Sequence, residues 1–209
     1  MFYENEGNVM TKYPHYLDAY DPIFQKYRDR KVSLVEIGVG YGGSLQLWKK
    51  YLGAQARVYG IDLQDCRKFN EPQIEVFVGD QADVGFLKGV FEKIGGVDIV
   101  IDDGSHRCED QIKSFETVFP FVANDGVYII EDVHTSYRPG YGGGLYCSGS
   151  LIEYMKQYID DLHYAEWGTP RNTFWRNIES INFYQSLVVV RKTDVNRDGP
   201  HTTGLLKMW

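Results

Sequence analysis

The sequence predicts an α/β fold: a mostly parallel sheet of about seven strands with helices on both faces. Short apolar runs alternate with helix-length amphipathic segments, which is the pattern of successive βαβ units. Acidic residues directly follow several apolar runs, and in open α/β sheets ligands bind just beyond the strand ends. With 209 residues and 43% hydrophobic content, the chain can bury one ordinary core. We therefore expect a single domain over residues 1–209.

Seven apolar runs have the length and the β-branched content of strands. Longer segments separate the first five, so these are expected to run parallel. The last two are close enough in sequence to form an antiparallel hairpin. The runs cover residues 33–37, 56–61, 74–78, 97–101, 126–130, 180–184 and 187–191.

The segments between the strands show helical periodicity. The opening segment is expected to be a helix or helix pair interrupted near Pro22, because proline removes a helical hydrogen bond. Residues 1–30 would form an N-terminal helical cap, and Gly53 ends the helix that follows the first strand. Helices are expected over residues 14–29, 45–51, 83–94, 108–122 and 149–162.

Residues 133–147 interrupt the alternation of strands and helices. They hold Pro139, four glycines and three tyrosines, and they follow a strand end. A long loop at this edge of a sheet suits a lid or a wall of a substrate site. The polar residues 194–209 are expected to be a loosely held tail.

Composition excludes several classes of function. The formal net charge is −7 and no basic stripe is visible, which argues against a nucleic-acid partner. The three cysteines form no CxxC pattern, so reduced thiols in a cytoplasmic protein are expected rather than disulfides or zinc. The N-terminus does not resemble a signal peptide, and no stretch approaches the roughly 18 apolar residues of a membrane span.

A glycine-rich turn, residues 36–44, follows the first strand and predicts a cofactor site. Glycines there let the backbone approach a ligand and place helix-start N–H groups beside it. Asp62 ends the second strand, where a carboxylate can bind ribose hydroxyls. Asp80 and Gln81 follow the third strand, where an adenine would lie.

The spacing of the glycines leaves the cofactor open. Gly38, Gly40 and Gly43 satisfy GxGxxG, which fits a dinucleotide. Glu36 before the first glycine and Asp80 after the third strand favour S-adenosylmethionine (SAM), because a pyrophosphate would gain nothing from a carboxylate so close. A plain strand–turn–helix, with the acidic groups capping local N–H groups, is a third interpretation.

Two acidic segments predict the chemistry: Asp102-Asp103-Gly104-Ser105-His106 and Glu131-Asp132-Val133-His134-Thr135-Ser136-Tyr137. Carboxylates prefer a hard divalent cation such as Mg²⁺, and an imidazole can move protons near neutral pH. In a regular strand Glu131 and Asp132 would face opposite ways, so both can bind one ion only if the backbone turns there. His106 could instead merely start the next helix, and Asp102 suits a structural role.

With these segments in order, residues 8–193 resemble the class I SAM-dependent methyltransferases. More narrowly, they are similar to the catalytic domain of the metal-dependent sugar O-methyltransferases of macrolide and polyketide biosynthesis, the mycinamicin 2″-O-methyltransferase type. The resemblance begins at Thr11-Lys12-Tyr13-Pro14-His15-Tyr16 and ends at residues 182–190. It implies a Rossmann-like class I methyltransferase fold.

The resemblance also implies roles for individual residues. His106 corresponds to the catalytic base, and Asp103, Glu131 and Asp132 correspond to the ligands of Mg²⁺, with Mn²⁺ and Ca²⁺ as alternatives. From the loop, His134, Tyr137 and Tyr141 are candidate contacts to the acceptor, although packing or capping is an alternative role for His134. The expected cofactor-binding set is Glu36, Gly38, Gly40, Ser44, Asp62, Asp80, Gln81 and Asp103.

The expected activity is Mg²⁺-dependent transfer of a methyl group from SAM to a hydroxyl of a sugar or glycosylated natural product. The acceptor is expected to be a small molecule carrying a diol, and a homo-oligomer is possible. The mycinamicin-type enzyme carries a further N-terminal domain for which this sequence has no room. The identity of the acceptor and the oligomeric state are therefore not inferred from the resemblance. The rival functions are a catechol or phenol O-methyltransferase, an NAD-dependent oxidoreductase and a non-catalytic SAM-fold subunit.

Overall fold

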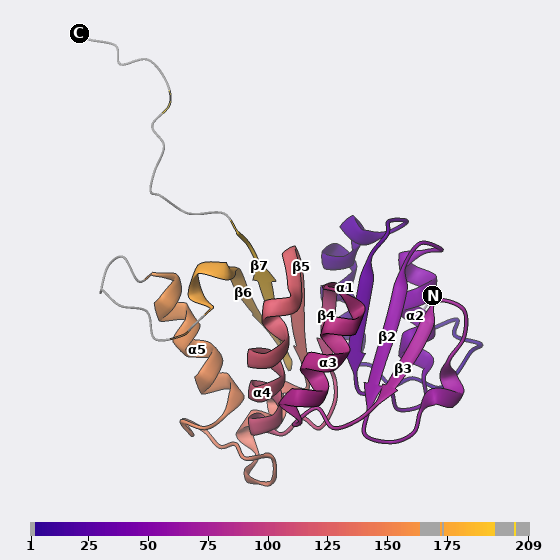
Figure 1. Ribbon diagram of the computed structural model, residues 1–209. Helices are drawn as coiled ribbons and strands as arrows, with labels where there is room; N and C mark the ends of the chain where they lie inside the picture. The colour runs from indigo at the N-terminus through magenta and orange to yellow at the C-terminus, as the bar shows by residue number, and fades with distance from the viewer. Residues whose placement is uncertain (1–2, 164–171, 173, 195–202, 204–209) are drawn as a thin grey trace.

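The computed structural model describes residues 3–163, 172, 174–194 and 203, and these form a seven-stranded sheet between two layers of helices (Figure 1). Across the sheet the strand order is β3-β2-β1-β4-β5-β7-β6. The strands are β1 (Ser33–Ile37), β2 (Arg57–Asp62), β3 (Ile74–Val78), β4 (Val97–Asp102), β5 (Val122–Glu131), β6 (Ile178–Tyr184) and β7 (Leu187–Lys192).

The topology confirms the predicted mixed sheet. β1 to β5 pair in parallel, whereas β7 runs antiparallel to both β5 and β6. The strand order reverses between β1 and β4, which is where open α/β sheets bind ligands. In the antiparallel register Glu131 lies opposite Leu187, so the turn of the β6–β7 hairpin reaches the same edge of the sheet.

Within the described residues five α-helices flank the sheet, and the first and the fourth end earlier than expected. Pro22 lies inside the first helix, which ends two residues later at Phe24 and is followed by a 3₁₀ turn over Gln25–Tyr27, so the helix ends before the expected residue 29. The fourth helix ends at Val118 rather than continuing to 122, since Pro120 follows in a short 3₁₀ turn and β5 already begins at Val122. The helices are α1 (Pro14–Phe24), α2 (Gly43–Leu52), α3 (Val84–Ile94), α4 (Cys108–Val118) and α5 (Leu151–Leu162).

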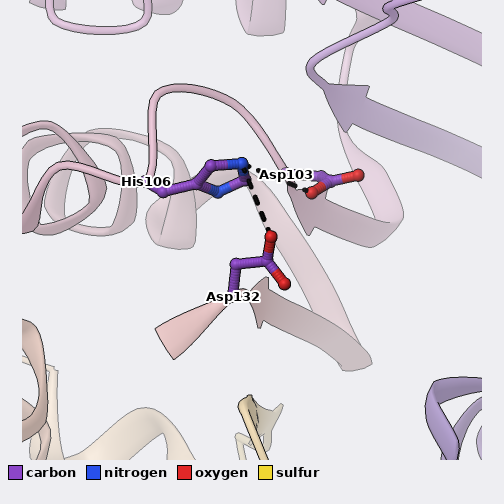
Figure 2. Close-up of side chains that lie close together, drawn as sticks. All are labelled: Asp103, His106 and Asp132. Atoms are coloured by element: carbon purple, nitrogen blue, oxygen red, sulfur yellow. Dashed lines mark ion pairs between the residues drawn. The ribbon is translucent and has the colours of Figure 1, made fainter. Parts of the chain in front are cut away.

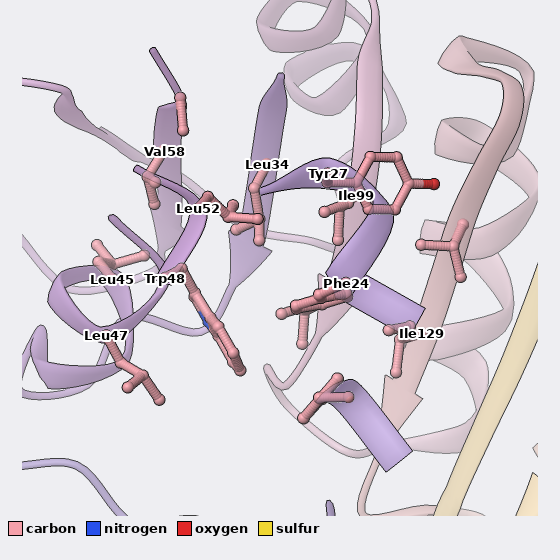
Figure 3. Close-up of a cluster of buried hydrophobic side chains, with 14 of the residues drawn as sticks. Phe24, Tyr27, Leu34, Leu45, Leu47, Trp48, Leu52, Val58, Ile99 and Ile129 are labelled. Atoms are coloured by element: carbon pink, nitrogen blue, oxygen red, sulfur yellow. The ribbon is translucent and has the colours of Figure 1, made fainter. Parts of the chain in front are cut away.

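The core has one cluster on each face of the sheet, because side chains alternate along each strand. On β1, Leu34 packs with α1 and α2, whereas Val35 packs with α3, α4 and α5. Figure 3 shows the first cluster, in which the aromatic side chains of Phe24 and Trp48 lie beside Leu34. This packing places the N-terminal end of α1 beside the carboxyl ends of β1, β4 and β5.

Three further expectations concern the cysteines, a membrane span and the tail. Cys66, Cys108 and Cys147 are free thiols. Within the described residues no helix is both long and apolar enough to cross a membrane. The predicted tail, 194–209, lies almost entirely outside the described residues.

Candidate active site

The glycine turn after β1 lies against the loop after β4. Gly38 has a φ of +96°, and a Cβ on it would lie 2.1 Å from the carbonyl oxygen of Asp103. The two strand ends are joined there by the Asp103 amide, which donates to the carbonyl of Ile37 at 2.8 Å. Glycine is therefore required at position 38 by both conformation and space.

Two adjoining cavities, of about 190 and 390 Å³, lie along these strand ends. They share Gly38, Asp62 and Gly104. Asp80 and Gln81 line the smaller cavity, and Gly40, Ser44 and Asp103 line the larger one. The structure thus brings together every residue of the expected cofactor set except Glu36.

Asp62 has an additional role in holding the glycine turn. Its Oδ2 accepts from the amides of Val39 and Gly40 at 2.8 and 3.1 Å, and its Oδ1 accepts from the Gln64 amide at 2.8 Å. The carboxylate therefore shapes the turn and also lines both cavities.

Gln81 and Asp102 form a buried polar network beside the smaller cavity. The Gln81 amide donates to Asp102 Oδ1 at 3.2 Å, and its Oε1 accepts from the Ser105 amide at 2.6 Å. Burial raises the pKa of Asp102 to about 7, and the Tyr128 hydroxyl donates to its second oxygen. Asp102 is fully buried, in agreement with a structural role.

Glu36 is fully buried and has both oxygens engaged within the protein. Oε1 accepts from Lys12 Nζ at 3.0 Å, and Oε2 accepts from Ser44 Oγ at 2.6 Å. Burial raises the pKa of Glu36, and Lys12 opposes this rise. The carboxylate thus serves chiefly as a partner for Lys12.

Lys12 lies at the centre of three carboxylates. Its Nζ donates to Asp103 Oδ2 and Glu131 Oε1, both at 2.6 Å, as well as to Glu36. Burial alone would lower the pKa of this ammonium, but the carboxylates of Glu131, Glu36 and Asp103 raise it well above its usual range. Glu36, Asp103 and Glu131, called here the inner group, are close enough to hold a cation, and the ammonium contacts all three.

Asp103, His106 and Asp132 form an outer group that opens into the larger cavity (Figure 2). His106 Nε2 lies 4.0 Å from Asp103 Oδ1 and 3.7 Å from Asp132 Oδ2. His106 and Asp132 both have left-handed backbones, with φ of 57° and 55°. The chain therefore does turn at Asp132. Such conformations cost energy in non-glycine residues and cluster at functional sites.

The three predicted metal ligands share a pattern of hydrogen bonding. Within the described chain, each carboxylate has one oxygen held by hydrogen bonds and one without any. Asp103 Oδ2 and Glu131 Oε1 accept from Lys12, and Asp132 Oδ1 accepts from the Tyr16 hydroxyl at 2.7 Å. Among the described residues, Asp103 Oδ1, Glu131 Oε2 and Asp132 Oδ2 accept no hydrogen bond, and His106 Nε2 lies 4.0 and 3.7 Å from the two aspartate oxygens. Carboxylate oxygens are the donor type that a hard divalent cation requires. The outer group, whose ligand atoms lie within 4.8 Å of one another, fits such an ion, whereas Glu131 is grouped with Asp103 and Glu36 around Lys12. The described structure therefore does not place the three predicted ligands in one close group.

The loop after β5 begins with two short 3₁₀ helices, Val133–Tyr137 and Pro139–Tyr141. His134 and Tyr137 line a cavity of about 310 Å³ between this loop, α5 and the β6–β7 hairpin, whereas Tyr141 is not among its lining residues. His134 Nδ1 lies 2.5 Å from the hydroxyl of Ser186 in the hairpin turn. Of the three predicted acceptor residues, His134 and Tyr137 therefore line one cavity and Tyr141 does not.

Sequence reasoning missed four residues of this site: Lys12, Tyr16, Tyr20 and Ser186. Tyr20 donates to Glu131 Oε1 at 2.5 Å, and burial raises the pKa of its phenol. Lys12 and Tyr16 lie in the segment where the family resemblance begins, but no role was assigned to them; the other local signal was the four-residue spacing of Tyr16 and Tyr20. That spacing is equally typical of core aromatic residues on a helix.

We expect Gly38→Ala to lower the free energy of unfolding by about 2–4 kcal/mol, combining left-handed strain with overpacking. The added methyl group would meet a backbone carbonyl, which cannot move without displacing the loop after β4. Urea unfolding followed by circular dichroism measures the loss.

Gly40→Ala is the matched control for this prediction. It lies in the same turn with a φ of +53°, and nothing lies within 4 Å of its added Cβ. The loss there should be only about 1–2 kcal/mol, from strain alone. Equal losses at the two positions would show that the contact with Asp103 is unimportant.

Comparison with known proteins gives several related O-methyltransferases. The chain is 38% identical over 189 residues to 8-demethyl-8-alpha-L-rhamnosyl tetracenomycin-C 2'-O-methyltransferase of Streptomyces olivaceus, an alignment covering 85% of this chain and 50% of the relative. It is 37% identical over 193 residues to mycinamicin VI 2''-O-methyltransferase of Micromonospora griseorubida, covering 86% and 47%. No family model matches the chain.

A solved structure supports the same relationship. The MycE methyltransferase from the mycinamycin biosynthetic pathway, in complex with Mg, SAH and mycinamycin VI, superposes with a TM-score of 0.84 at 34% identity. The match covers 95% of this chain and 54% of MycE. The chain thus spans about half the length of the relatives it matches.

The strand order and the superposition on MycE show the fold of the class I methyltransferases. Within that class, the chain is a homologue of the sugar O-methyltransferases of macrolide and polyketide pathways. The predicted fold and family resemblance are both confirmed.

Proposed function

We propose that this chain catalyses transfer of the methyl group of SAM to a sugar hydroxyl of a glycosylated small molecule, with help from a bound divalent ion. The observation that carries the proposal is the outer group beside the cofactor cavities: an imidazole nitrogen within 4.0 Å of two carboxylate oxygens that accept no hydrogen bond among the described residues. The homologous sugar O-methyltransferases, and the Mg and SAH bound to MycE, support the same activity.

SAM is proposed to bind in the two adjoining cavities. The adenine end would lie by Asp80 and Gln81, and the ribose by Asp62. The larger cavity, which continues to Asp103 and His106, would direct the methyl group toward the outer group. A dinucleotide would have to place its pyrophosphate near carboxylates. The glycine turn has no lysine or arginine to offset the repulsion between these negative charges.

Proton removal is assigned to His106. The reaction forms an O–CH₃ bond, breaks the S–CH₃ bond, and releases S-adenosylhomocysteine (SAH) and the proton of the hydroxyl. His106 Nε2 would accept that proton, because it lies beside the larger cavity at 3.7 Å from Asp132 Oδ2 and 4.0 Å from Asp103 Oδ1. A positioned base is needed because a sugar hydroxyl has a pKa far above 7.

The divalent ion is proposed to be held by Asp103, Asp132 and Glu131 through their unpaired oxygens. When bound, such an ion lowers the pKa of a coordinated hydroxyl and orients a diol. Mg²⁺ is our first choice, and oxygen ligands also suit Mn²⁺ and Ca²⁺.

The apolar portion of the acceptor is proposed to lie in the cavity of about 310 Å³ next to His134. Tyr137, Ile159, Phe183 and Tyr184 line it and are each between 42% and 49% exposed. Large apolar side chains gathered on a surface commonly mark a binding site. We propose that residues 133–147 form one wall of this site.

Calorimetric titration of the protein with SAM, in Mg²⁺ and again in EDTA, tests the proposal. We expect SAM to bind and NAD not to bind. Methyl transfer to rhamnosides with free vicinal hydroxyls should then require Mg²⁺ and stop in EDTA. Catechol as a parallel acceptor identifies the phenol O-methyltransferase alternative. Absence of SAM binding in both buffers would overturn the proposed function.

A further inference from the structure

The three hydrogen-bond donors that hold the candidate metal ligands all come from one short segment. Lys12 precedes α1, Tyr16 lies in its first turn and Tyr20 one turn later. Residues four apart lie on the same face of a helix, and this face meets the carboxyl ends of β4 and β5. None of the three lies on the strand ends or loops that provide the carboxylates.

Each donor takes a single oxygen of its carboxylate. Tyr20 and Lys12 converge on Glu131 Oε1, at 2.5 and 2.6 Å, and Lys12 also donates to Asp103 Oδ2 at 2.6 Å. Tyr16 donates to Asp132 Oδ1 at 2.7 Å. Fixing one oxygen restricts rotation of the carboxylate and directs the other oxygen. In the described chain those other oxygens are the unpaired ones.

Tyr16 also supports the backbone at Asp132. Its hydroxyl accepts from the Asp132 amide at 3.2 Å and lies 2.9 Å from the carbonyl oxygen of Ser186. Tyr16 is 1% exposed, so these contacts are shielded from water. One side chain therefore joins the left-handed turn at Asp132, the Asp132 carboxylate and the hairpin turn.

We propose that Lys12, Tyr16 and Tyr20 are positioning residues that orient Asp103, Glu131 and Asp132 for binding of a divalent ion. The N-terminal helix then sets the affinity of the site without contacting the ion. The inference rests on the proposed metal dependence. Its physical basis is general, because hydrogen bonds to metal ligands fix their orientation, and losing one typically costs about 10–100-fold in affinity.

The test is the affinity for Mn²⁺, measured from the electron paramagnetic resonance signal of free Mn²⁺ during titration. Tyr16→Phe and Tyr20→Phe each remove one hydroxyl and keep the ring that packs in the core. We expect each to weaken Mn²⁺ binding about 10–100-fold. The affinity for SAH in EDTA should stay near wild type, and the midpoint of urea unfolding in EDTA should fall only as far as loss of one buried hydrogen bond requires, which a general structural defect would exceed.

Tyr27→Phe is the matched control. Tyr27 is a buried tyrosine just beyond α1, and its hydroxyl donates to the carbonyl of Asp125, not to a candidate ligand. It should bind Mn²⁺ as the wild type does. Mn²⁺ affinities of Tyr16→Phe and Tyr20→Phe within twofold of wild type would overturn the inference. A wild-type protein that binds SAM but no Mn²⁺ would instead overturn the metal dependence itself.

Discussion

His106→Ala is expected to lower kcat for methyl transfer to a sugar hydroxyl by about 10²–10⁴-fold, the usual contribution of a positioned base. Nε2 of this residue faces two carboxylates beside the larger cavity, whereas its Nδ1 is buried and has no partner in the described chain. The affinities for SAH and Mn²⁺ should change little, because the proposed ligands are carboxylates. Steady-state kinetics and titration of each ligand measure the effects separately.

Two outcomes would contradict this role. If Mn²⁺ binding falls together with kcat, His106 is a ligand of the ion and not a base. If kcat is retained on the native acceptor, the acceptor is acidic enough to need no base, which favours a phenol. His163→Ala, at the end of α5 far along the chain from the acidic segments, is the control and should have wild-type kinetics.

Lys12→Met is expected to lower the free energy of unfolding by about 3–5 kcal/mol, the usual cost of removing one partner from a buried ion pair. The side chain of Lys12 is 2% exposed, and those of Glu36 and Glu131 are 0% and 2% exposed. Without the ammonium, the carboxylates of the inner group would have no buried counter-charge. Urea unfolding at several pH values measures the loss.

The pH dependence of this loss has a definite sign. Burial already raises the pKa of Glu36 and Glu131, so the folded protein holds their protons to higher pH than the unfolded chain does. The stability that these two groups contribute therefore falls as the pH rises above their pKa values in the unfolded chain, which are near 4.5. Removing Lys12 raises both pKa values further, so the loss should be larger at pH 8 than at pH 5.

Lys26→Met is the control for this prediction. Its ammonium pairs with Asp125 at 2.6 Å, but the side chains of that pair are 32% and 81% exposed. Exposed pairs are worth about 0–1 kcal/mol. A Lys12→Met variant that loses no more stability than Lys26→Met would show that the inner group carries little charge in the folded protein.

The fold could be predicted because the determining signals are local. In a run such as 97–101 every residue except Asp98 is apolar because the strand is covered on both faces, and the acidic residues after it mark where it ends. The mistaken helix end at 122 has a local cause as well. Pro120 ends α4 early, and residues 123–125, of which Asn124 and Asp125 are polar and which were assigned to no strand, extend β5 toward its beginning.

The site was only partly predictable. The carboxylates were found because they follow strands, but their partners are remote: Lys12 is 24, 91 and 119 residues from Glu36, Asp103 and Glu131. No periodicity relates such positions, and only the packing of α1 on the sheet brings them together. For the same reason Glu36 was expected to face the cofactor, whereas its two oxygens are taken by Lys12 and Ser44.

The antiparallel hairpin at the edge of the sheet has a consequence for the evolution of substrate choice. The cofactor cavities are lined by residues before position 133, and the cavity assigned to the acceptor is lined entirely by residues from 133 onward. The two sets of residues can therefore diverge separately. A duplicated gene could replace the segment from residue 133 onward and so change its proposed acceptor. The residues that line the cofactor cavities would stay unchanged. Chimeras joined at Asp132 offer a direct way to build such variants.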